Sequence, residues 1–138
     1  MLSSAARNAT QRIIGNMKIV IIGPGAGGKD HARNILIDKF VPSVSYTTRP
    51  MRPGETDGKD YHYVSVDEFR RLIADGFFYE WNFFADAWYY GTPKNSFENG
   101  STLFIMTPSG VRSLSEKHRQ ESAVVYINPD ESIRRARL

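Results

Sequence analysis

The sequence predicts a three-layer α/β fold, in which a parallel β-sheet carries helices on both faces. Short apolar segments rich in β-branched residues occur at residues 18–22, 102–106 and 123–127, and segments of helical character alternate with them. Residues 43–92 depart from this alternation because they contain several short strand-like segments. We therefore expect this stretch to form an inserted, mixed α+β subdomain.

The composition is that of a globular domain. The chain has 138 residues, of which 41% are hydrophobic and 24% charged, and it contains no cysteine, so disulfides and thiolate metal sites are excluded. The net charge is only +3, without a long basic run, which does not favour nucleic acid as a partner. No apolar stretch reaches membrane-spanning length, so we expect no membrane association. The sequence leaves the oligomeric state open.

Residues 1–16 precede the first predicted strand and differ from the rest of the chain. They contain Arg7 and Arg12, no acidic residue, and several serines and alanines. An organelle transit peptide has this composition, and so does an upstream extension before Met17. We expect a disordered N-terminal extension and a cytoplasmic domain at residues 17–138.

A glycine-rich turn at residues 23–30 follows the first predicted strand and precedes a helix predicted from Asp30 to about Phe40. Glycines let backbone N–H groups point at an anion, and the helix N-terminus adds positive potential. Lys29 would reach the outer phosphates of a nucleotide. The alternative is a chance G-x-x-x-x-G-K match, against which the flanking strand and helix argue. Asp30 occupies the position of the usual Ser or Thr; its carboxylate can hold Mg²⁺ but also repels phosphate.

The predicted insertion begins with a strand at residues 43–48, which leads into an irregular loop containing Arg49 and Arg52. A second strand is predicted at residues 61–64. Ser65 and Glu68 then match a capping box before a short amphipathic helix that Gly76 ends.

Residues 77–81 form an aromatic strand-like segment that contains one acid, Glu80. A solvent-facing position on an edge strand would explain this acid, and so would contact with a ligand. Residues 88–92 are again aromatic. Helices are predicted at residues 93–99 and 109–118, and a last one from Pro129 to the final residue.

Together these segments resemble the guanylate kinase family. The motifs that carry the resemblance are G-P-G-A-G-G-K, S-V-S-Y-T-T-R-P-M-R-P-G-E-T-D-G-K-D-Y-H-Y-V-S, F-Y-E-W and Y-Y-G-T, and similarity runs from about Lys18 to Leu138. The resemblance implies a P-loop NTPase-type sheet with helices on both faces. Its core would comprise residues 17–42 and 93–138, and the GMP-binding subdomain residues 43–92.

The resemblance also implies roles for individual residues and an ATP-dependent, Mg²⁺-assisted phosphorylation of GMP or dGMP. Mg²⁺ is expected near Asp30. The implied catalytic residues are Lys29, Arg49, Arg52 and the lid arginine Arg137. The implied ATP-binding residues are Gly23, Pro24, Gly25, Ala26, Gly27, Gly28, Lys29 and Asp30. The implied GMP-binding residues are Ser45, Arg49, Arg52, Tyr61, Glu80, Tyr90 and Thr92.

Two departures from the family pattern favour a second interpretation. The family usually has two aspartates where this chain has Ile105 and Thr107, and it usually continues for tens of residues beyond this C-terminus. A fragment or shortened relative is therefore expected. A catalytically weak or inactive module that binds a phosphorylated or acidic peptide through Arg49 and Arg52 is the main alternative. A kinase for another deoxynucleoside monophosphate is a smaller one.

Overall fold

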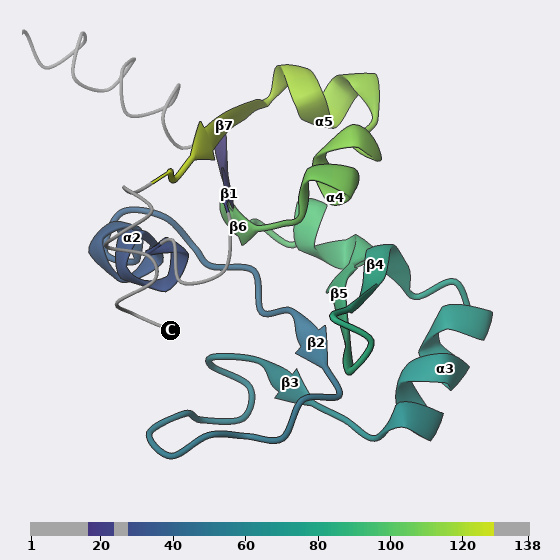
Figure 1. The fold of residues 1–138 in the computed structure, drawn as a ribbon. Coiled ribbons are helices and arrows are strands. Elements are labelled where there is room, and N and C mark those ends of the chain that lie inside the picture. Colours follow the sequence, from purple (N-terminus) through teal and green to yellow (C-terminus); the bar gives the residue numbers. More distant parts are fainter. Residues whose placement is uncertain (1–16, 24–27, 129–138) are drawn as a thin grey trace, which may run out of the picture. The chain divides into compact units, whose positions relative to one another are not determined.

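The computed structural model describes residues 17–23 and 28–128. The chain divides into two compact units, one formed by the residues up to Pro42 together with those from Ser101 onward, and the other by Ser43–Gly100 (Figure 1). The extension at 1–16, the last predicted helix and Arg137 lie outside the described residues. Within the described residues, none of the helices has the length and apolar character needed to cross a bilayer.

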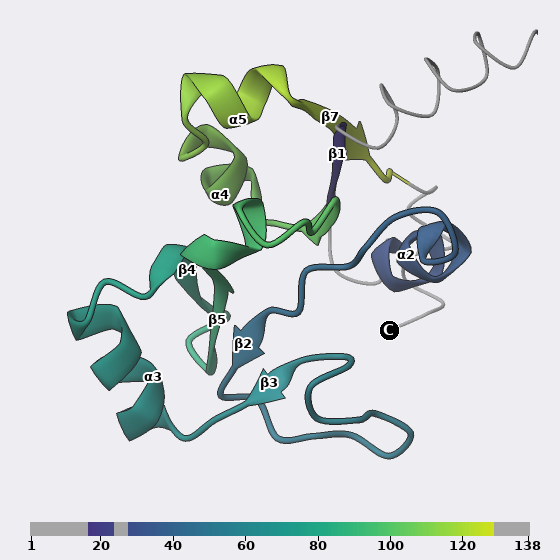
Figure 2. The same cartoon turned by 180° about the vertical axis from the view of Figure 1, so that it is seen from behind.

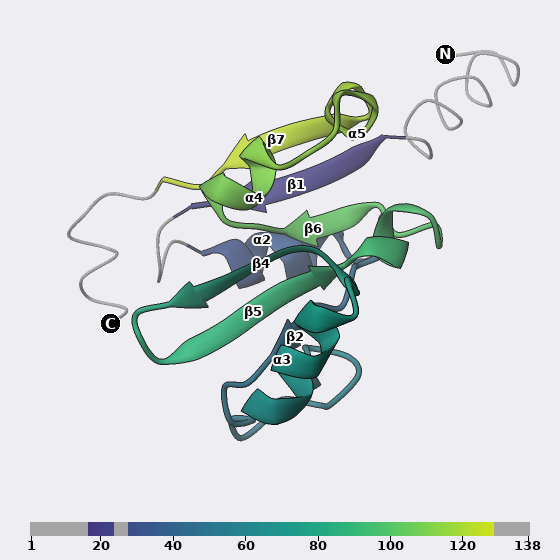
Figure 3. The ribbon, with the colours of Figure 1, turned by 90° about the vertical axis from the view of Figure 1, so that its right-hand side faces the viewer.

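The first unit is built on a parallel sheet with the strand order β6-β1-β7. Its strands are β1 (Lys18–Ile22), β6 (Leu103–Ile105) and β7 (Ser122–Tyr126). Val20 of β1 aligns with Phe104 on one side and Val124 on the other. Figure 3 shows β1 running between its two neighbours. The parallel sheet predicted from the three apolar segments is confirmed.

Helices cover both faces of this sheet. Helix α2 (Lys29–Leu36) lies on one face, and α4 (Pro108–Arg112) and α5 (Glu116–Gln120) lie on the other (Figure 2). Among the described residues, the buried core of the unit is formed by Val20, Ile21, Leu103, Phe104, Met106 and Leu114. The predicted three-layer arrangement is thus confirmed.

Two helix predictions in this unit are wrong in extent. The helix expected to run to about Phe40 ends at Leu36, and Ile35 in its last turn is 64% exposed. The single helix expected at residues 109–118 is two helices, because Ser115 caps a new one by accepting a hydrogen bond from the His118 amide at 3.2 Å. Serine favours such local bonds over helix interiors.

The second unit contains a mixed sheet with the strand order β3-β2-β5-β4, in which β2 pairs parallel with β3 and antiparallel with β5. Its strands β2 and β3 are shorter than the predicted segments at 43–48 and 61–64. Its elements are β2 (Tyr46–Thr47), β3 (His62–Tyr63), α3 (Val66–Ala74), β4 (Phe78–Phe84), β5 (Trp88–Pro93) and η1 (Lys94–Phe97), a 3₁₀ turn where a helix was expected at 93–99.

Helix α3 begins and ends as the sequence predicts. The Ser65 hydroxyl accepts a hydrogen bond from the Glu68 amide at 3.1 Å, and Gly76 supplies the positive φ of +69° that follows the helix. The buried Phe69 stacks on Phe78 with a centroid distance of 4.5 Å and on Tyr89 at 5.0 Å. The helix therefore packs on the face of the β4–β5 hairpin that carries Tyr89.

Candidate functional site

The phosphate-loop region of the first unit begins where β1 ends. A Cβ atom on Gly23 would lie 2.4 Å from the Ile127 carbonyl oxygen, so only glycine allows the chain to pass the end of β7 this closely. Gly28 adopts φ +88°, and α2 begins at the next residue. Residues 24–27 of the predicted loop lie outside the described residues.

The Lys29 side chain folds back toward the start of the loop. Its Nζ atom donates a hydrogen bond to the Gly23 carbonyl at 2.9 Å, which brings the ammonium group back to the start of the loop. Asp30 lies in the first turn of α2, and the position of its side chain is outside the description. In the described part of the chain, no group of three or more His, Cys, Asp or Glu side chains is placed to hold a metal ion.

The carboxyl ends of the parallel strands meet at the sheet edge where the phosphate loop begins. Ile105 is the last residue of β6, and Thr107 caps α4 by accepting a hydrogen bond from the Gly110 amide at 3.1 Å. The two positions at which the resemblance leads one to expect aspartate therefore lie at this edge. In this chain one side chain is apolar, and the other serves as a helix cap.

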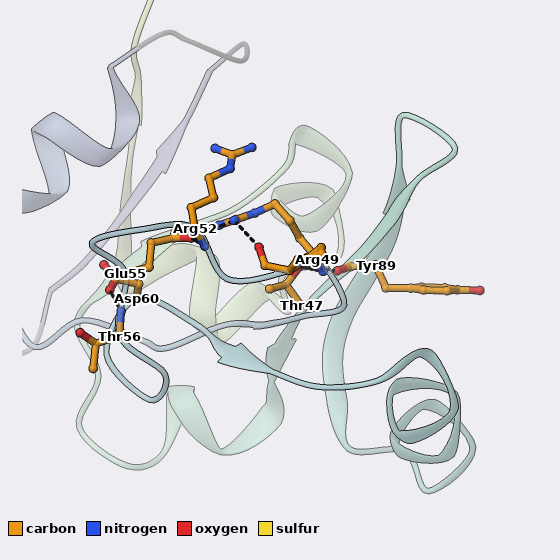
Figure 4. A network of polar contacts seen from close by, with 8 residues as sticks. Thr47, Arg49, Arg52, Glu55, Thr56, Asp60 and Tyr89 are labelled. Carbon is orange, nitrogen blue, oxygen red and sulfur yellow. Dashed lines mark hydrogen bonds and ion pairs between the residues drawn. The ribbon is translucent and has the colours of Figure 1, made fainter.

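A second candidate region lies in the 43–100 unit and centres on Arg49. Its guanidinium forms a two-pronged ion pair with Glu55, in which Nη1 donates to Oε1 and Nη2 to Oε2, each at 2.8 Å (Figure 4). The Arg49 side chain is 7% exposed and that of Glu55 is 21% exposed. This geometry is the one that guanidinium groups form with planar anions.

Three tyrosines surround this ion pair. The Arg49 guanidinium carbon lies 5.4 Å from the Tyr61 ring centroid and 5.9 Å from that of Tyr63. The Tyr61 ring in turn lies 5.9 Å from that of Tyr90. We call Arg49, Glu55, Tyr61, Tyr63 and Tyr90 the Arg49 cluster. It brings together one predicted arginine and both predicted tyrosines.

Electrostatics in the Arg49 cluster stabilise the charged forms of the pair. The hydrogen bonds from Arg49 lower the pKa of Glu55 to about 2, and the Arg52 amide contributes. The pKa of Arg49 is raised, mainly by hydrogen bonding to Glu55, and Tyr90 adds to the rise. Burial, and then Glu55, raise the pKa of Tyr63, whose buried hydroxyl has no hydrogen-bond partner among the described residues.

Hydrogen bonds fix the position of the loop that carries Arg49. The Thr47 hydroxyl donates to the Tyr89 carbonyl at 2.9 Å and accepts from the Arg49 amide at 3.1 Å. Farther along, Asp60 accepts from the Thr56 amide at 2.6 Å. Sequence reasoning assigned no role to Thr47, Glu55 or Asp60. The dense polar motif between residues 47 and 60 was the available signal.

Arg52 has a different environment from Arg49. Its amide donates to the Glu55 carboxylate at 2.7 Å, but its side chain is exposed. Figure 4 shows its guanidinium extending away from the ion pair. The structure thus brings the Arg52 backbone to the Arg49 cluster and leaves its charged group in solvent.

Two of the three residues expected to read a base pair directly across the sheet, and the third lies just before the start of the neighbouring strand. Glu80 of β4 pairs with Thr92 of β5, and the Thr92 hydroxyl donates to the Glu80 carboxylate at 2.8 Å. Ser45 directly precedes β2, and if the register that pairs Tyr46 with Gly91 continues by one residue, Ser45 faces Thr92. We call Ser45, Thr92 and Glu80 the first cross-strand row.

Glu80 is a carboxylate that is largely withdrawn from solvent. Burial raises its pKa, and the hydrogen bond from Thr92 opposes that rise. Among the described residues, Glu80 has no ion-pair partner. Although β4 is an edge strand, the solvent-facing explanation for this acid is wrong. An uncompensated, largely buried carboxylate is an acceptor that suits a ligand with hydrogen-bond donors.

Comparison with known proteins places these features in a family. The family model described as guanylate kinase matches residues 15–137. The chain belongs to the guanylate kinase family. It is 38% identical over 122 residues to the guanylate kinase of Onion yellows phytoplasma (strain OY-M), covering 82% of this chain and 57% of that relative. It is 40% identical over 123 residues to that of Novosphingobium aromaticivorans, covering 83% of this chain and 55% of the relative.

The fold of the chain is also that of a solved guanylate kinase. The crystal structure of guanylate kinase from Anaplasma phagocytophilum superposes with a TM-score of 0.74 at 30% sequence identity, covering 88% of this chain and 65% of that one. The chain thus spans a little over half of the length of the curated relatives that it matches and about two thirds of the solved structure.

Proposed function

We propose that this chain supplies the phosphate loop and the acceptor-binding unit of an ATP-dependent guanylate kinase, which converts GMP or dGMP to the diphosphate. The observation that carries the proposal is the largely buried Glu80 carboxylate, which Thr92 orients across the sheet beside the Arg49 cluster. Family membership supports it.

The first cross-strand row has the chemistry to select guanine. Guanine presents N1–H and N2–H₂ as adjacent donors, and a carboxylate only accepts hydrogen bonds. Glu80 would accept from both, with Ser45 and Thr92 beside it in the row. Adenine presents a lone pair at N1, which the carboxylate would repel.

The Arg49 cluster has the chemistry to bind the acceptor phosphate. Arg49 is already held in a two-pronged geometry, and Tyr61 and Tyr90 lie beside it. The exposed Arg52 would add a second cation. Glu55 is a positioning residue in this proposal, because it orients Arg49 from the loop.

The reaction moves the γ-phosphoryl group of ATP to an oxygen of the acceptor phosphate and gives ADP and GDP. The attacking oxygen is already ionised, so the enzyme needs charge neutralisation and alignment rather than a general base. Lys29 would neutralise donor phosphates in this proposal, and Arg137 remains a predicted lid arginine. When bound, Mg²⁺ neutralises phosphate charge; the Asp30 carboxylate is a hard oxygen ligand that suits it.

The deciding experiment measures GDP formation from ATP and GMP by the purified chain, with AMP as the competing acceptor and the Lys29→Ala variant as the control. The proposal expects GMP-selective turnover that the Lys29→Ala variant loses. Turnover of AMP at the same rate as GMP would contradict the role of Glu80. GMP binding without turnover in any ATP or Mg²⁺ concentration would favour the binding-module alternative, which a titration with a phosphorylated peptide then tests.

A further inference from the structure

The β4–β5 hairpin carries a second polar position next to the first cross-strand row. The pairing register is unbroken from Glu80 to Phe84, and it places Asn82 of β4 directly opposite Tyr90 of β5. The pairing of β2 with β5 adds Thr47, which aligns with Tyr90 from the other side. We call Thr47, Tyr90 and Asn82 the second cross-strand row.

Both rows lie on the same face of the hairpin. Side chains alternate between faces along a strand, so Glu80, Asn82 and Phe84 share one face. Contacts on either side of Asn82 agree with this alternation: Thr92 hydrogen-bonds to Glu80, and the Phe84 ring lies 6.4 Å from that of Tyr90.

The opposite face of the hairpin packs against α3 through Tyr89, although Trp81 and Phe83 on this face remain 46% and 45% exposed. Tyr89 contacts the rings of Phe69 at 5.0 Å, Phe83 at 4.8 Å and Trp81 at 5.9 Å. Gly91 also belongs to that face, since an added Cβ would lie 2.7 Å from the Phe78 ring. Asn82 therefore lies on the face of the candidate site and not on the face that α3 covers.

The two rows correspond to two parts of a nucleotide. In the proposed function, the first cross-strand row reads the base, and Tyr90, in the second, contacts the phosphate together with Arg49. In a nucleotide the sugar connects base and phosphate. Asn82 stands two residues, about 7 Å, along the strand from the base reader and directly across from the phosphate tyrosine.

We propose that Asn82 is a specificity-determining residue that hydrogen-bonds a hydroxyl of the acceptor's sugar. This inference rests on the proposed function and goes beyond it by naming the side chain that reads the sugar between the base and the phosphate. A carboxamide has two N–H donors and an oxygen with two lone pairs, so one side chain of this kind can hydrogen-bond to the protein and to a ligand hydroxyl at the same time.

The other members of the row are less suited to this task. The Thr47 hydroxyl is engaged in two hydrogen bonds, to the Tyr89 carbonyl and from the Arg49 amide, and Thr47 is fully buried. The next pair along the hairpin, Phe84 and Trp88, is apolar. Asn82 is thus the amide side chain at the level where the sugar hydroxyls would lie.

The test measures dissociation constants of GMP, 2′-deoxy-GMP, 3′-deoxy-GMP and AMP for the wild-type chain and for Asn82→Ala. One neutral hydrogen bond corresponds to a factor of about 2 to 12 in affinity. We expect the wild type to bind GMP more tightly than one deoxy analogue by such a factor. Asn82→Ala should weaken GMP by the same factor, leave that analogue unchanged, and keep the preference for GMP over AMP.

Controls separate this role from a structural one. Asn82→Val removes both polar groups and retains a residue that favours strands, so it replaces the alanine variant if that one fails to fold. Asn95→Ala changes an exposed asparagine of η1 outside both rows and should leave all four constants unaltered.

Three results would overturn the inference. The deoxy analogue could lose the same factor as GMP in Asn82→Ala, the mutation could have no effect, or the preference over AMP could collapse, which indicates distortion of the first row. A wild-type chain that binds no GMP would instead overturn the proposed function, and the inference with it. The two failures are therefore distinguishable.

Discussion

The Arg49 cluster and the first cross-strand row lie in the same unit, and each contains one carboxylate. The pKa values of these two carboxylates are shifted in opposite directions. Glu55 has two hydrogen bonds from a guanidinium, and its pKa falls to about 2. Among the described residues, the Glu80 carboxylate accepts a hydrogen bond from one neutral donor, the Thr92 hydroxyl, and burial raises its pKa. The compensated acid stabilises the loop and orients Arg49. In the proposed function, the uncompensated acid keeps its acceptor capacity for the donors of guanine.

Arg49→Ala removes the ion pair with Glu55, and we expect it to have the largest effect of the variants considered. Loss of a buried, hydrogen-bonded charge from a binding site costs about 2–5 kcal/mol, so GMP affinity should fall roughly 30- to 5,000-fold. The variant also leaves Glu55 without its partner, which should lower the free energy of unfolding by about 3 kcal/mol. Calorimetric titration and urea unfolding measure the two quantities.

Two other arginines calibrate that result. Arg52→Ala should weaken GMP binding with little change in the free energy of unfolding, because the Arg52 side chain is exposed. Arg70→Ala, on the exposed surface of α3, should change neither quantity. Equal stability loss in Arg49→Ala and Arg52→Ala would contradict the assignment of the ion pair as a structural element.

Glu80→Gln tests the uncompensated side. The amide retains one acceptor but turns N–H groups toward the guanine donors, and losing a charged hydrogen bond costs about 1.5–3 kcal/mol. GMP should bind about 10- to 150-fold more weakly, while AMP binding is unchanged or improved. Unfolding at neutral pH should require at least as much urea as in the wild type. Glu98→Gln, at an exposed position in the same unit, is the matched control. Retained preference for GMP over AMP in Glu80→Gln would contradict the proposal that Glu80 reads the base.

The pH dependence of stability should carry opposite signs for the two acids. Glu55 releases its proton more readily in the folded chain, so its stabilising contribution exists above the unfolded pKa of 4.5 and disappears as the pH falls toward about 2. The folded-state pKa of Glu80 is raised, so the folded chain loses stability as the pH rises from 4.5 through that value. Each slope is at most about 1.4 kcal/mol per pH unit.

Urea unfolding across pH 2–7 measures these slopes. In Glu55→Gln, the free energy of unfolding should fall less steeply as the pH drops below 4.5. In Glu80→Gln, its decrease at higher pH should disappear. If both variants alter the same limb in the same direction, the contrast between the two acids is wrong.

Thr92→Val should give the smallest effect. Valine matches threonine in shape, but removes the hydroxyl that donates to Glu80, so the pKa of Glu80 should rise further. GMP affinity should fall about 2- to 12-fold at neutral pH, the range for one neutral hydrogen bond, and the loss should shrink as the pH is raised. Thr56→Val, at an exposed position of the loop, is the control. A loss independent of pH would argue against an effect through Glu80.

Local sequence signals predicted the elements whose causes are local. The apolar run at residues 18–22 became β1, and the capping residue Ser65 with the terminal Gly76 delimited α3. Predictions were wrong where two local signals competed. Ser115 could continue a helix or cap a new one, and capping prevailed because its hydroxyl satisfies an otherwise unpaired amide.

In the candidate site, individual residues could likewise be predicted from local sequence, whereas their contacts could not. Arg49, Glu80 and Thr92 could be singled out from motifs in the sequence, but their partners could not. Glu55 lies six residues from Arg49 in an irregular loop with no periodicity to indicate the pairing. Whether Ser45, Thr92 and Glu80 share a row depends on strand register, since a shift of one residue would turn each side chain to the other face.

By itself, the sequence determined the residue chemistry of this protein, its local elements and its family. Backbone preferences, helix capping and the alternation of apolar and polar residues act over a few residues, so they can be predicted from the sequence. The tertiary structure decided which acid is compensated and which is not, and which asparagine shares a face with the first cross-strand row. Those outcomes depend on burial and register between segments far apart in sequence, and only the folded chain brings these segments together.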